Sequence, residues 1–288
     1  MTRLSRYKLQ YIGSVLLYGT IGMIVRQISF PSDFIVLCRG LIGGLFILSF
    51  RLLSGHRPEK KAIQTNTKWL ILSGACLGFN WIFLFAAYVH TTVAIASLFN
   101  YMAPILLVLL SPLLFKEKLT AKKLLCVGAA LLGVLFISGV LTGRSQALHP
   151  IGMAYAALAA IGFSALVVCN RRMSSDLSPY DRSFVQLFIS ALIVLPYVLL
   201  MNRGIQLSWD LRSVLLTLLI GILQTGVAYI WYFGSIPEIP TQTFAVLGYL
   251  EPTMSVLCSA LILREPKGLT GWIGALLIIG AAVVNELI

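Results

Sequence analysis

Residues 100–104 read Asn-Tyr-Met-Ala-Pro and residues 248–252 read Gly-Tyr-Leu-Glu-Pro, so the two stretches align with an offset of 148. The same offset places Glu117 on Glu265, and in both copies a Leu-Thr pair follows and leads into an apolar run that contains glycines. Because several anchors agree in one register, the chain is predicted to be an internal duplication.

Apolar runs of membrane-spanning length surround these anchors. A helix needs about 20 mainly apolar residues to cross the hydrocarbon core of a bilayer. Of the 288 residues 58% are hydrophobic and only 11% are charged, which excludes an ordinary soluble domain and predicts an all-α integral membrane protein. Ten transmembrane helices are expected: Tyr11–Ile28, Phe34–Leu53, Trp69–Tyr88, Val93–Phe115, Ala121–Leu141, Ile151–Asn170, Ser183–Met201, Leu211–Phe233, Thr241–Leu263 and Gly271–Ile288.

The lysines and arginines between the spans predict the orientation of the chain. With the N-terminus inside, fifteen of them lie in inner segments and five in outer loops. Positively charged flanks stay on the cytoplasmic side, so both termini are predicted to be cytoplasmic, in an inner or plasma membrane. Because an odd number of helices separates the copies, the first repeat (1–145) and the second (146–288) are expected to be inverted around a central cavity.

Chemistry-bearing motifs are missing from the sequence. The five cysteines form no CxxC pair, the three histidines are scattered, and no Walker, HExxH or GxSxG motif occurs. We therefore expect no enzyme activity, no metal site and no cofactor. The net charge of +12 comes from loop residues rather than from one basic face, so nucleic acid is not an expected partner.

A family resemblance follows from these features. Arg39 early in the second span, Pro104 and Pro252 in the fourth and ninth spans, and Lys/Arg-Glu followed by Leu-Thr before the fifth and tenth spans resemble the drug/metabolite transporter superfamily. Within it the EamA-type ten-helix exporters, which include the aromatic amino acid exporter group, are most similar. The resemblance implies a central cavity lined mainly by helices one, three, four, six, eight and nine.

Three ionisable residues within the predicted spans stand out, because charge there is costly and often functional: Arg26, Arg39 and Glu251. Arg26 is close enough to a helix end to reach the interface, and Arg39 either contacts substrate or binds backbone carbonyls or a lipid headgroup. Burial favours the neutral form of a carboxyl, so Glu251 is a candidate for proton coupling or for attracting a cation. The alternative for Glu251 is a hydrogen-bonded structural role.

Polar and aromatic residues at membrane depth complete the candidate site. As cavity-lining or helix-bridging residues we single out Asn80, Trp81, Asn100, Tyr101, Gln224, Tyr229, Trp231, Tyr249 and Glu251. Pro104 and Pro252 are expected to bend their helices and to expose a backbone carbonyl. The pairs Gly40/Gly44, Gly74/Gly78 and Gly139/Gly143 have GxxxG spacing and are expected to form packing seams.

The resemblance and the candidate walls together predict a transporter, with the lipid bilayer and a small-molecule substrate as partners. We expect an exporter of small metabolites such as amino acids, working by alternating access, with aromatic or apolar side chains favoured and protons as a candidate coupling ion. Uptake or exchange of a sugar, nucleotide derivative or choline-like cation is the alternative, as is a channel or lipid flippase. A monomer or weak homodimer is expected.

Overall fold

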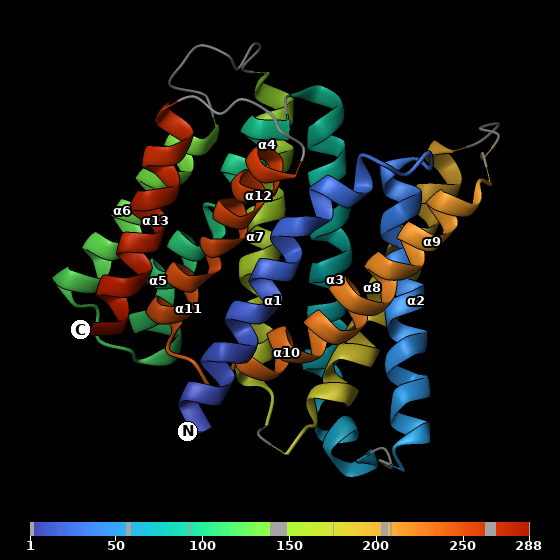
Figure 1. Cartoon of the computed structure of the whole chain (residues 1–288). Helices are drawn as coiled ribbons and strands as arrows, with labels where there is room; N and C mark the ends of the chain where they lie inside the picture. Colours follow the sequence, from blue (N-terminus) through green and yellow to red (C-terminus); the bar gives the residue numbers. More distant parts are fainter. Residues whose placement is uncertain are drawn as a thin grey trace. The chain divides into compact units, whose positions relative to one another are not determined.

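The computed structural model describes residues 3–55, 59–91, 93–138, 149–174, 176–202, 207, 209–262 and 269–287. Among these residues every regular element is a helix (Figure 1). The order is α1 (Arg3–Val25), α2 (Ser32–Leu53), α3 (Lys60–His90), α4 (Val93–Asn100), α5 (Ala103–Phe115), α6 (Ala121–Ser138), α7 (Pro150–Arg172), α8 (Pro179–Met201), α9 (Leu211–Leu219), η2 (Ile220–Val227), α10 (Ala228–Ser235), α11 (Thr241–Gly248), α12 (Leu250–Leu261) and α13 (Leu269–Leu287). The predicted all-α membrane fold is thus confirmed.

Seven helices in the described part of the chain are long and apolar enough to cross a membrane. They cover Arg3–Val25, Ser32–Leu53, Lys60–His90, Ala96–Phe115, Pro150–Arg172, Pro179–Met201 and Leu211–Ser235. Helices also occupy the other three predicted spans, but α6 and α13 are short and the ninth span is divided between α11 and α12. The number of ten membrane crossings therefore stays a prediction.

The observed helices differ from the predicted spans at several ends. Helix α3 begins at Lys60 rather than at Trp69, because the charged residues of its first turns hide its start from a hydropathy reading. There Asn66 Nδ2 donates to Ser174 Oγ at 2.8 Å, and Ser174 N donates back to Asn66 Oδ1 at 2.9 Å. A polar contact therefore adds to the apolar packing of Ala62 and Ile63 against Met173 and Leu177 in holding this segment.

The helices form two compact units, and each draws on both halves of the sequence. Unit 1 comprises Met1–Ile82 and Ala165–Glu238, and unit 2 comprises Phe83–Ser164 and Ile239–Ile288. Helices α3 and α7 each contribute to both units. The units are therefore not the two sequence repeats, and the repeat boundary after residue 145 stays a prediction.

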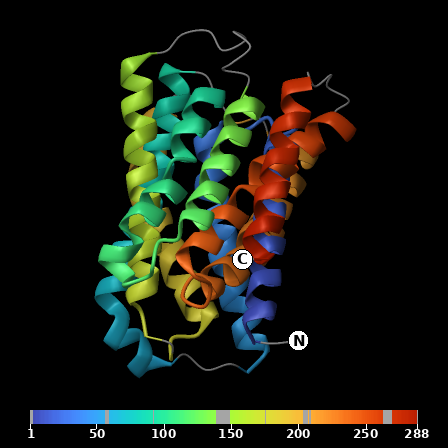
Figure 2. The same cartoon turned by 90° about the vertical axis from the view of Figure 1, so that its left-hand side faces the viewer.

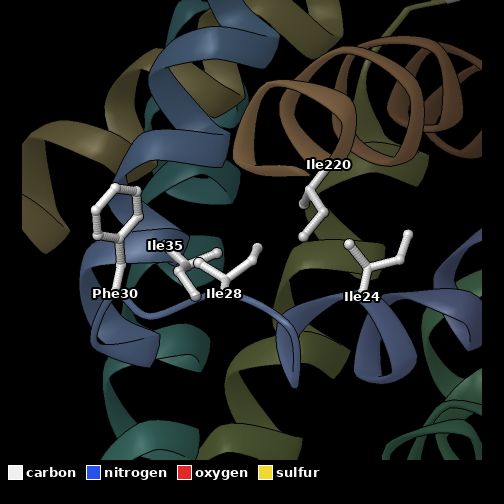
Figure 3. Close-up of a cluster of buried hydrophobic side chains, with 5 residues drawn as sticks. All are labelled: Ile24, Ile28, Phe30, Ile35 and Ile220. Atoms are coloured by element: carbon white, nitrogen blue, oxygen red, sulfur yellow. The ribbon is translucent and has the colours of Figure 1, made fainter. Parts of the chain in front are cut away.

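In unit 1 a cluster of buried apolar side chains joins the end of α1, the start of α2 and η2. Figure 3 shows its members, Ile24, Ile28, Phe30, Ile35 and Ile220. In a bilayer, lipid tails are as apolar as these side chains, so the cluster stabilises the unit through close packing rather than through removal from water. The β-branched isoleucines have few rotamers to lose on packing.

Glycines let the helices of unit 1 approach closely. A Cβ atom added to Gly74 would lie 2.8 Å from the Cβ of Ile189, and one added to Gly78 would lie 3.0 Å from the Cβ of Ile193. The predicted Gly74/Gly78 seam is therefore confirmed as a contact of α3 with α8. Gly40 and Gly44 have looser neighbours, at 3.5 Å or more, and Gly139/Gly143 lie outside the described residues.

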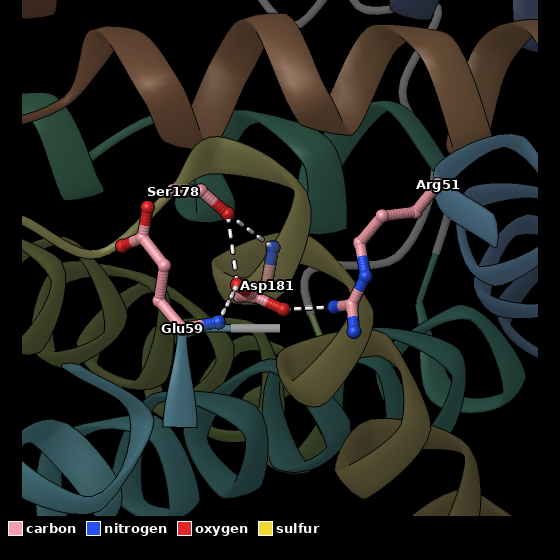
Figure 4. A network of polar contacts seen from close by, with 4 residues as sticks. All are labelled: Arg51, Glu59, Ser178 and Asp181. Carbon is pink, nitrogen blue, oxygen red and sulfur yellow. Dashed lines mark hydrogen bonds and ion pairs between the residues drawn. The ribbon is translucent and has the colours of Figure 1, made fainter. Parts of the chain in front are cut away.

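A buried ion pair in unit 1 links α2 to α8 (Figure 4). Arg51 Nη1 donates to Asp181 Oδ1, and both side chains are buried. The second oxygen, Oδ2, accepts from Ser178 Oγ at 3.0 Å and from the backbone N of Glu59 at 3.4 Å. The carboxylate oxygens are thus all bonded, as a buried charge requires, whereas the buried Arg51 Nε has no hydrogen-bond partner among the described residues.

Side-chain oxygens also define where several helices begin. Ser178 Oγ accepts from Asp181 N at the start of α8. Asp210 Oδ1 accepts from Ser213 N at 2.8 Å at the start of α9, and hydrogen bonds from Ser213 hold the pKa of the Asp210 carboxyl below its usual value. In unit 2 Glu117 accepts from Thr241 N at 3.0 Å and from Thr241 Oγ1 at 2.8 Å. The glutamate of the first Lys-Glu motif thus caps α11, where a negative charge complements the helix dipole.

Unit 2 is built around the repeat-equivalent helices α6 and α13, which lie side by side in Figures 1 and 2. A Cβ atom added to Gly133 would lie 2.7 Å from the carbonyl oxygen of Gly274. One added to Gly274 would overlap the carbonyl oxygen of Gly133. The two helices therefore cross backbone to backbone at this pair of glycines.

We expect Gly274→Ala to lower the stability of the protein, because its methyl group overlaps the Gly133 carbonyl, which cannot move without shifting α6. Overpacking of this kind costs about 1–3 kcal/mol. Gly280→Ala is the matched control, since no atom lies within 4 Å of its added Cβ. Thermal unfolding in detergent, followed by circular dichroism, measures both. Equal midpoints for the two variants would contradict the close crossing.

Candidate functional site

The π-helix η2 places two polar side chains inside unit 1. It interrupts the eighth predicted span at Ile220–Val227, and Gln224 and Thr225 lie near its centre. Added Cβ atoms at Gly221 and Gly226 would lie 2.5 Å from side-chain atoms of Ile42 and Phe46, so both glycines are needed for the contact with α2. Wide helical turns of this kind recur at functional sites because they re-aim side chains.

Arg39 of α2 lies against this π-helix in what we call the Arg39 cluster: Arg39, Trp81, Thr225 and Tyr229. Arg39 Nε donates to Thr225 Oγ1 at 3.1 Å. The guanidinium carbon lies 5.4 Å from the ring centroid of Trp81 and 5.9 Å from that of Tyr229, within the range of cation–π attraction. The Thr225 hydroxyl therefore holds one edge of the Arg39 guanidinium, and the positive charge lies near the rings of Trp81 and Tyr229.

Further aromatic residues continue from this cluster. The Trp81 and Tyr229 rings are 6.4 Å apart in an edge-on arrangement. Tyr18 of α1 lies 5.4 Å from Tyr229 and 5.6 Å from Tyr232. Such tilted pairs favour a fixed arrangement of rings, which gives unit 1 a rigid aromatic wall beside a cation.

Gln224 adds an amide to the same unit. Its Nε2 donates to Thr20 Oγ1 at 2.6 Å, whereas its buried Oε1 has no hydrogen-bond partner among the described residues. A buried amide oxygen left without a donor is costly, so its position indicates a place for a donor that enters from outside the protein.

The remaining predicted residues of unit 1 lie in different settings. Asn80 is buried and next to Trp81 on α3. Trp231 is half-buried, and its ring would lie 3.1 Å from a Cβ added to Gly13, so its observed contact is helix packing. Arg26 follows the last residue of α1 and is exposed, which agrees with the interfacial alternative.

In unit 2 both predicted proline kinks coincide with short interruptions of the helix, of two residues in one case and one in the other. Helix α4 ends at Asn100 and α5 begins at Ala103, while α11 ends at Gly248 and α12 begins at Leu250. Pro104 and Pro252 therefore lie in the first turn of the following segment, where the missing N–H costs nothing. The spans predicted over 93–115 and 241–263 are thus each divided into two helical segments, and the first still provides one membrane-length helix over Ala96–Phe115.

The repeat-equivalent tyrosines meet at these breaks. Tyr249 is fully buried, and its hydroxyl donates to the carbonyl oxygen of Tyr101 at 3.0 Å. The interruption frees this carbonyl, because the N–H of Ile105, its partner in a continuous helix, donates to the Met102 carbonyl at 3.0 Å instead. One repeat thus supplies the donor that the other repeat lacks.

Glu251 joins this arrangement as the second residue of α12. Its carboxyl lies close enough to the Tyr101 hydroxyl and to Tyr88, near the end of α3, to interact with both electrostatically. The Tyr88 hydroxyl in turn hydrogen-bonds Ser97 of α4. We call Tyr88, Tyr101, Tyr249 and Glu251 the Glu251 cluster. A carboxyl held by phenols has partners in both protonation states, since a phenol both donates and accepts.

The structure thus groups Trp81 and Tyr229 with Arg39 in unit 1, and Tyr101 and Tyr249 with Glu251 in unit 2. Gln224 lies next to Thr225 in the chain but bonds to Thr20, and Asn100, half-buried, ends α4 beside the first interruption. Sequence reasoning missed Thr20, Thr225 and Tyr88. The polar pair Gln224-Thr225 stands between two glycines in an apolar run, and that spacing was the available signal for Thr225. Tyr88 closes an apolar span and resembles an interfacial aromatic.

Tyr249→Phe is expected to destabilise the protein, because it leaves the Tyr101 carbonyl without its donor at a buried position. An unsatisfied buried group of this kind costs about 1–3 kcal/mol. Thermal unfolding of the purified variant measures the loss. Tyr155→Phe is the matched control, since Tyr155 contacts Phe83 and His90 through its ring. A Tyr249→Phe midpoint equal to that of the control would show that the bond contributes nothing.

Comparison with known proteins identifies the fold and the family. The EamA-like transporter family matches residues 7–139 and again residues 150–286. The chain is 27% identical over 245 residues to the uncharacterized transporter YxxF of Bacillus subtilis, covering 85% of this chain and 78% of that protein. It is 24% identical over 272 residues to an uncharacterized transporter of Archaeoglobus fulgidus, covering 94% and 93%, and 24% identical over 225 residues to protein PecM of Dickeya dadantii, covering 75% and 72%.

A solved crystal structure of a protein 22% identical in sequence has the same fold, with a TM-score of 0.83 over 98% of each chain. The family matches together cover most of the chain, once in each half, as expected for the duplication inferred from the offset of 148. The chain is therefore a multi-pass membrane transporter that belongs to the EamA-like transporter family.

Proposed function

We propose that this transporter exports a small carboxylate-bearing metabolite with an apolar or aromatic side chain, such as an aromatic amino acid, by alternating access. The observation that carries the proposal is the Arg39 cluster, in which a guanidinium inside a membrane-spanning unit is bordered by Trp81 and Tyr229. Charged side chains within the membrane commonly mark substrate pathways.

The donor inventory of Arg39 favours a carboxylate ligand. A guanidinium carries five N–H donors, and in this cluster Thr225 accepts from Nε. Within the described residues no carboxylate forms an ion pair with Arg39. Arginine binds carboxylates through two parallel hydrogen bonds, which fixes orientation as well as charge. A substrate carboxylate would thus supply the acceptors that the surrounding side chains do not.

The rest of the unit suits the other ends of such a substrate. The faces and edges of Trp81 and Tyr229 offer apolar area with fixed geometry for an aromatic or aliphatic side chain. The buried Gln224 Oε1 would accept from an ammonium or hydroxyl group. Together these groups match an amino acid better than a sugar, which presents many hydroxyls and no charge.

The family duplication supports alternating access as the mechanism. Inverted-repeat transporters generally move substrate by rocking one set of helices against another, around discontinuous helices near the midplane. The broken pairs α4/α5 and α11/α12 are discontinuities of this kind. Export rather than uptake is the direction of the family members that this chain resembles, and it is part of the proposal.

A ligand panel tests the substrate class. We expect phenylalanine, tyrosine or leucine to raise the melting temperature of the purified protein, because a ligand that binds only the native state stabilises it by mass action, by about 2.7 kcal/mol at a concentration of about 100 times Kd. The corresponding amines, which lack the carboxylate, should have no effect. Arg39→Gln should abolish the shift while Arg26→Gln, in the exposed turn after α1, should retain it.

Two results would overturn the assignment. Equal shifts with amino acids and their amines would remove the carboxylate from recognition, and a full amino acid shift in Arg39→Gln would place the site elsewhere. A panel in which only sugars or choline-like cations stabilise the protein would favour the alternative substrate classes. Flux in vesicles that never saturates would favour a channel.

We further propose that Glu251 couples transport to protons. In proteoliposomes Glu251→Gln, which is neutral at every pH, should lose the acceleration of transport by a pH gradient while keeping exchange of labelled for unlabelled substrate. Glu238→Gln is the control, because Glu238 pairs with the exposed Arg3 at the edge of unit 1. Full gradient dependence in Glu251→Gln would exclude Glu251 as the coupling group.

A further inference from the structure

An apolar groove runs along the contact between α6 and α13 in unit 2. It is an open surface groove of about 560 Å³, lined on one side by residues such as Cys126 and Ala129 and on the other by residues such as Ile273, Gly280 and Val284. Lys122 is its one charged lining residue among those described. The groove is thus an apolar surface with the positive charge of Lys122 at one end.

The shape of the groove follows from the glycine crossing described above. Helices α6 and α13 touch backbone to backbone at Gly133 and Gly274, next to the end of the groove formed by Ala129 and Ile273. Toward Lys122 and Val284 the space between them is open, since no atom lies within 4 Å of a Cβ added to Gly280. The small residues Cys126, Ala129, Gly280 and Ala281 leave this space between the two helices unfilled.

The length of the groove matches one leaflet of a bilayer. Ile273 and Val284 are eleven residues apart on α13, which corresponds to about 16 Å at about 1.5 Å per residue. Half of a hydrocarbon core of about 30 Å is about 15 Å. One extended acyl chain therefore fits along the groove with its carboxyl end at Lys122.

The charge at the open end selects the headgroup. Residues 116–123 contain four lysines and one glutamate, and Glu117 is already bonded to Thr241 at the start of α11. Lys122 lines the groove at the start of α6, where its aliphatic stem can lie along the apolar wall while its ammonium reaches the headgroup level. The excess of positive charge favours a phosphate that bears no compensating cation.

We infer that this groove binds one anionic phospholipid, with an acyl chain between α6 and α13 and the headgroup phosphate at Lys122. The site is separate from the proposed substrate groups, none of which lines the groove. A zwitterionic lipid would place its own cation near the same lysines and bind less tightly. Basic clusters at the cytoplasmic end of membrane helices recognise anionic lipids in this way.

Native mass spectrometry of the full chain, released from nanodiscs containing equal amounts of phosphatidylglycerol and phosphatidylcholine with identical acyl chains, tests the inference. We expect wild-type protein to retain phosphatidylglycerol about fivefold more than phosphatidylcholine. Lys122→Gln should remove this preference, and Gly280→Leu, which fills the groove, should reduce retention of both lipids. Lys60→Gln and Gly128→Leu are the matched controls, because Lys60 starts α3 in unit 1 and Gly128 has open space outside the groove on α6.

Equal retention of the two lipids by wild-type protein, or unchanged phosphatidylglycerol retention in both Lys122→Gln and Gly280→Leu, would overturn the site. A wild-type dimer that carries no lipid and becomes a monomer in Gly280→Leu would show that a second copy of the chain occupies the groove instead. Because Lys122 is exposed, Lys122→Gln keeps the inference testable even where Gly280→Leu fails to fold.

Discussion

The bilayer interior offers no water, so every backbone group that a helix break frees must find its partner within the protein. Both breaks of unit 2 obey this constraint, and they do so differently. The Tyr249 carbonyl accepts from Thr253 Oγ1 at 3.3 Å, one turn along its own helix. The repeat-equivalent of Thr253 is Ile105, which has no hydroxyl, and the Tyr101 carbonyl accepts from the Tyr249 hydroxyl instead. The helix pair α4/α5 therefore receives a hydrogen-bond donor from Tyr249, between α11 and α12. Glu251 lies two residues after this tyrosine.

In unit 1 one residue, Thr225, both packs against a neighbouring helix and bonds to Arg39. Gly43 lies one turn after Arg39 on α2, and a Cβ at Gly43 would lie 2.8 Å from Thr225 Cγ2. The methyl of Thr225 therefore fills the space that the glycine leaves, while its hydroxyl accepts from Arg39. A larger residue at position 43 would separate the hydroxyl from the guanidinium without touching either. The close approach of α2 and η2 is thus a requirement of the Arg39 cluster rather than a by-product of membrane packing.

Hydropathy and the internal offset were sufficient to predict the all-helical membrane fold and the duplication, because each depends on composition or on spacing along the chain. The family resemblance pointed to Arg39 and to the helices that carry Trp81 and Tyr229, and their role as site residues stays a prediction. The rest depends on geometry that spacing does not encode. The π-helix that aims Gln224 and Thr225 arises from contacts with α2, and the early start of α3 arises from the Asn66–Ser174 pair. A proline indicates a bend, but whether the helix only bends or stops is decided by the donors nearby, such as the hydroxyl of Tyr249.

Duplication explains the scaffold, and the differences between the copies explain where chemistry can reside. Tyr101 and Tyr249 are the same residue type at equivalent positions, and they form a structural bond. Ala103 and Glu251 are also equivalent, and only the second can carry a proton. Helices α6 and α13 repeat this pattern, since α6 opens with Lys122 and Lys123 whereas α13 opens with the uncharged sequence Leu-Thr-Gly-Trp. Two identical copies would form a symmetric bundle, in which every ionisable residue of one repeat has an equivalent in the other. Substitution in one copy alone would therefore let a duplicated bundle bind a proton on one side, as proposed for Glu251, or an anionic lipid, as inferred for Lys122.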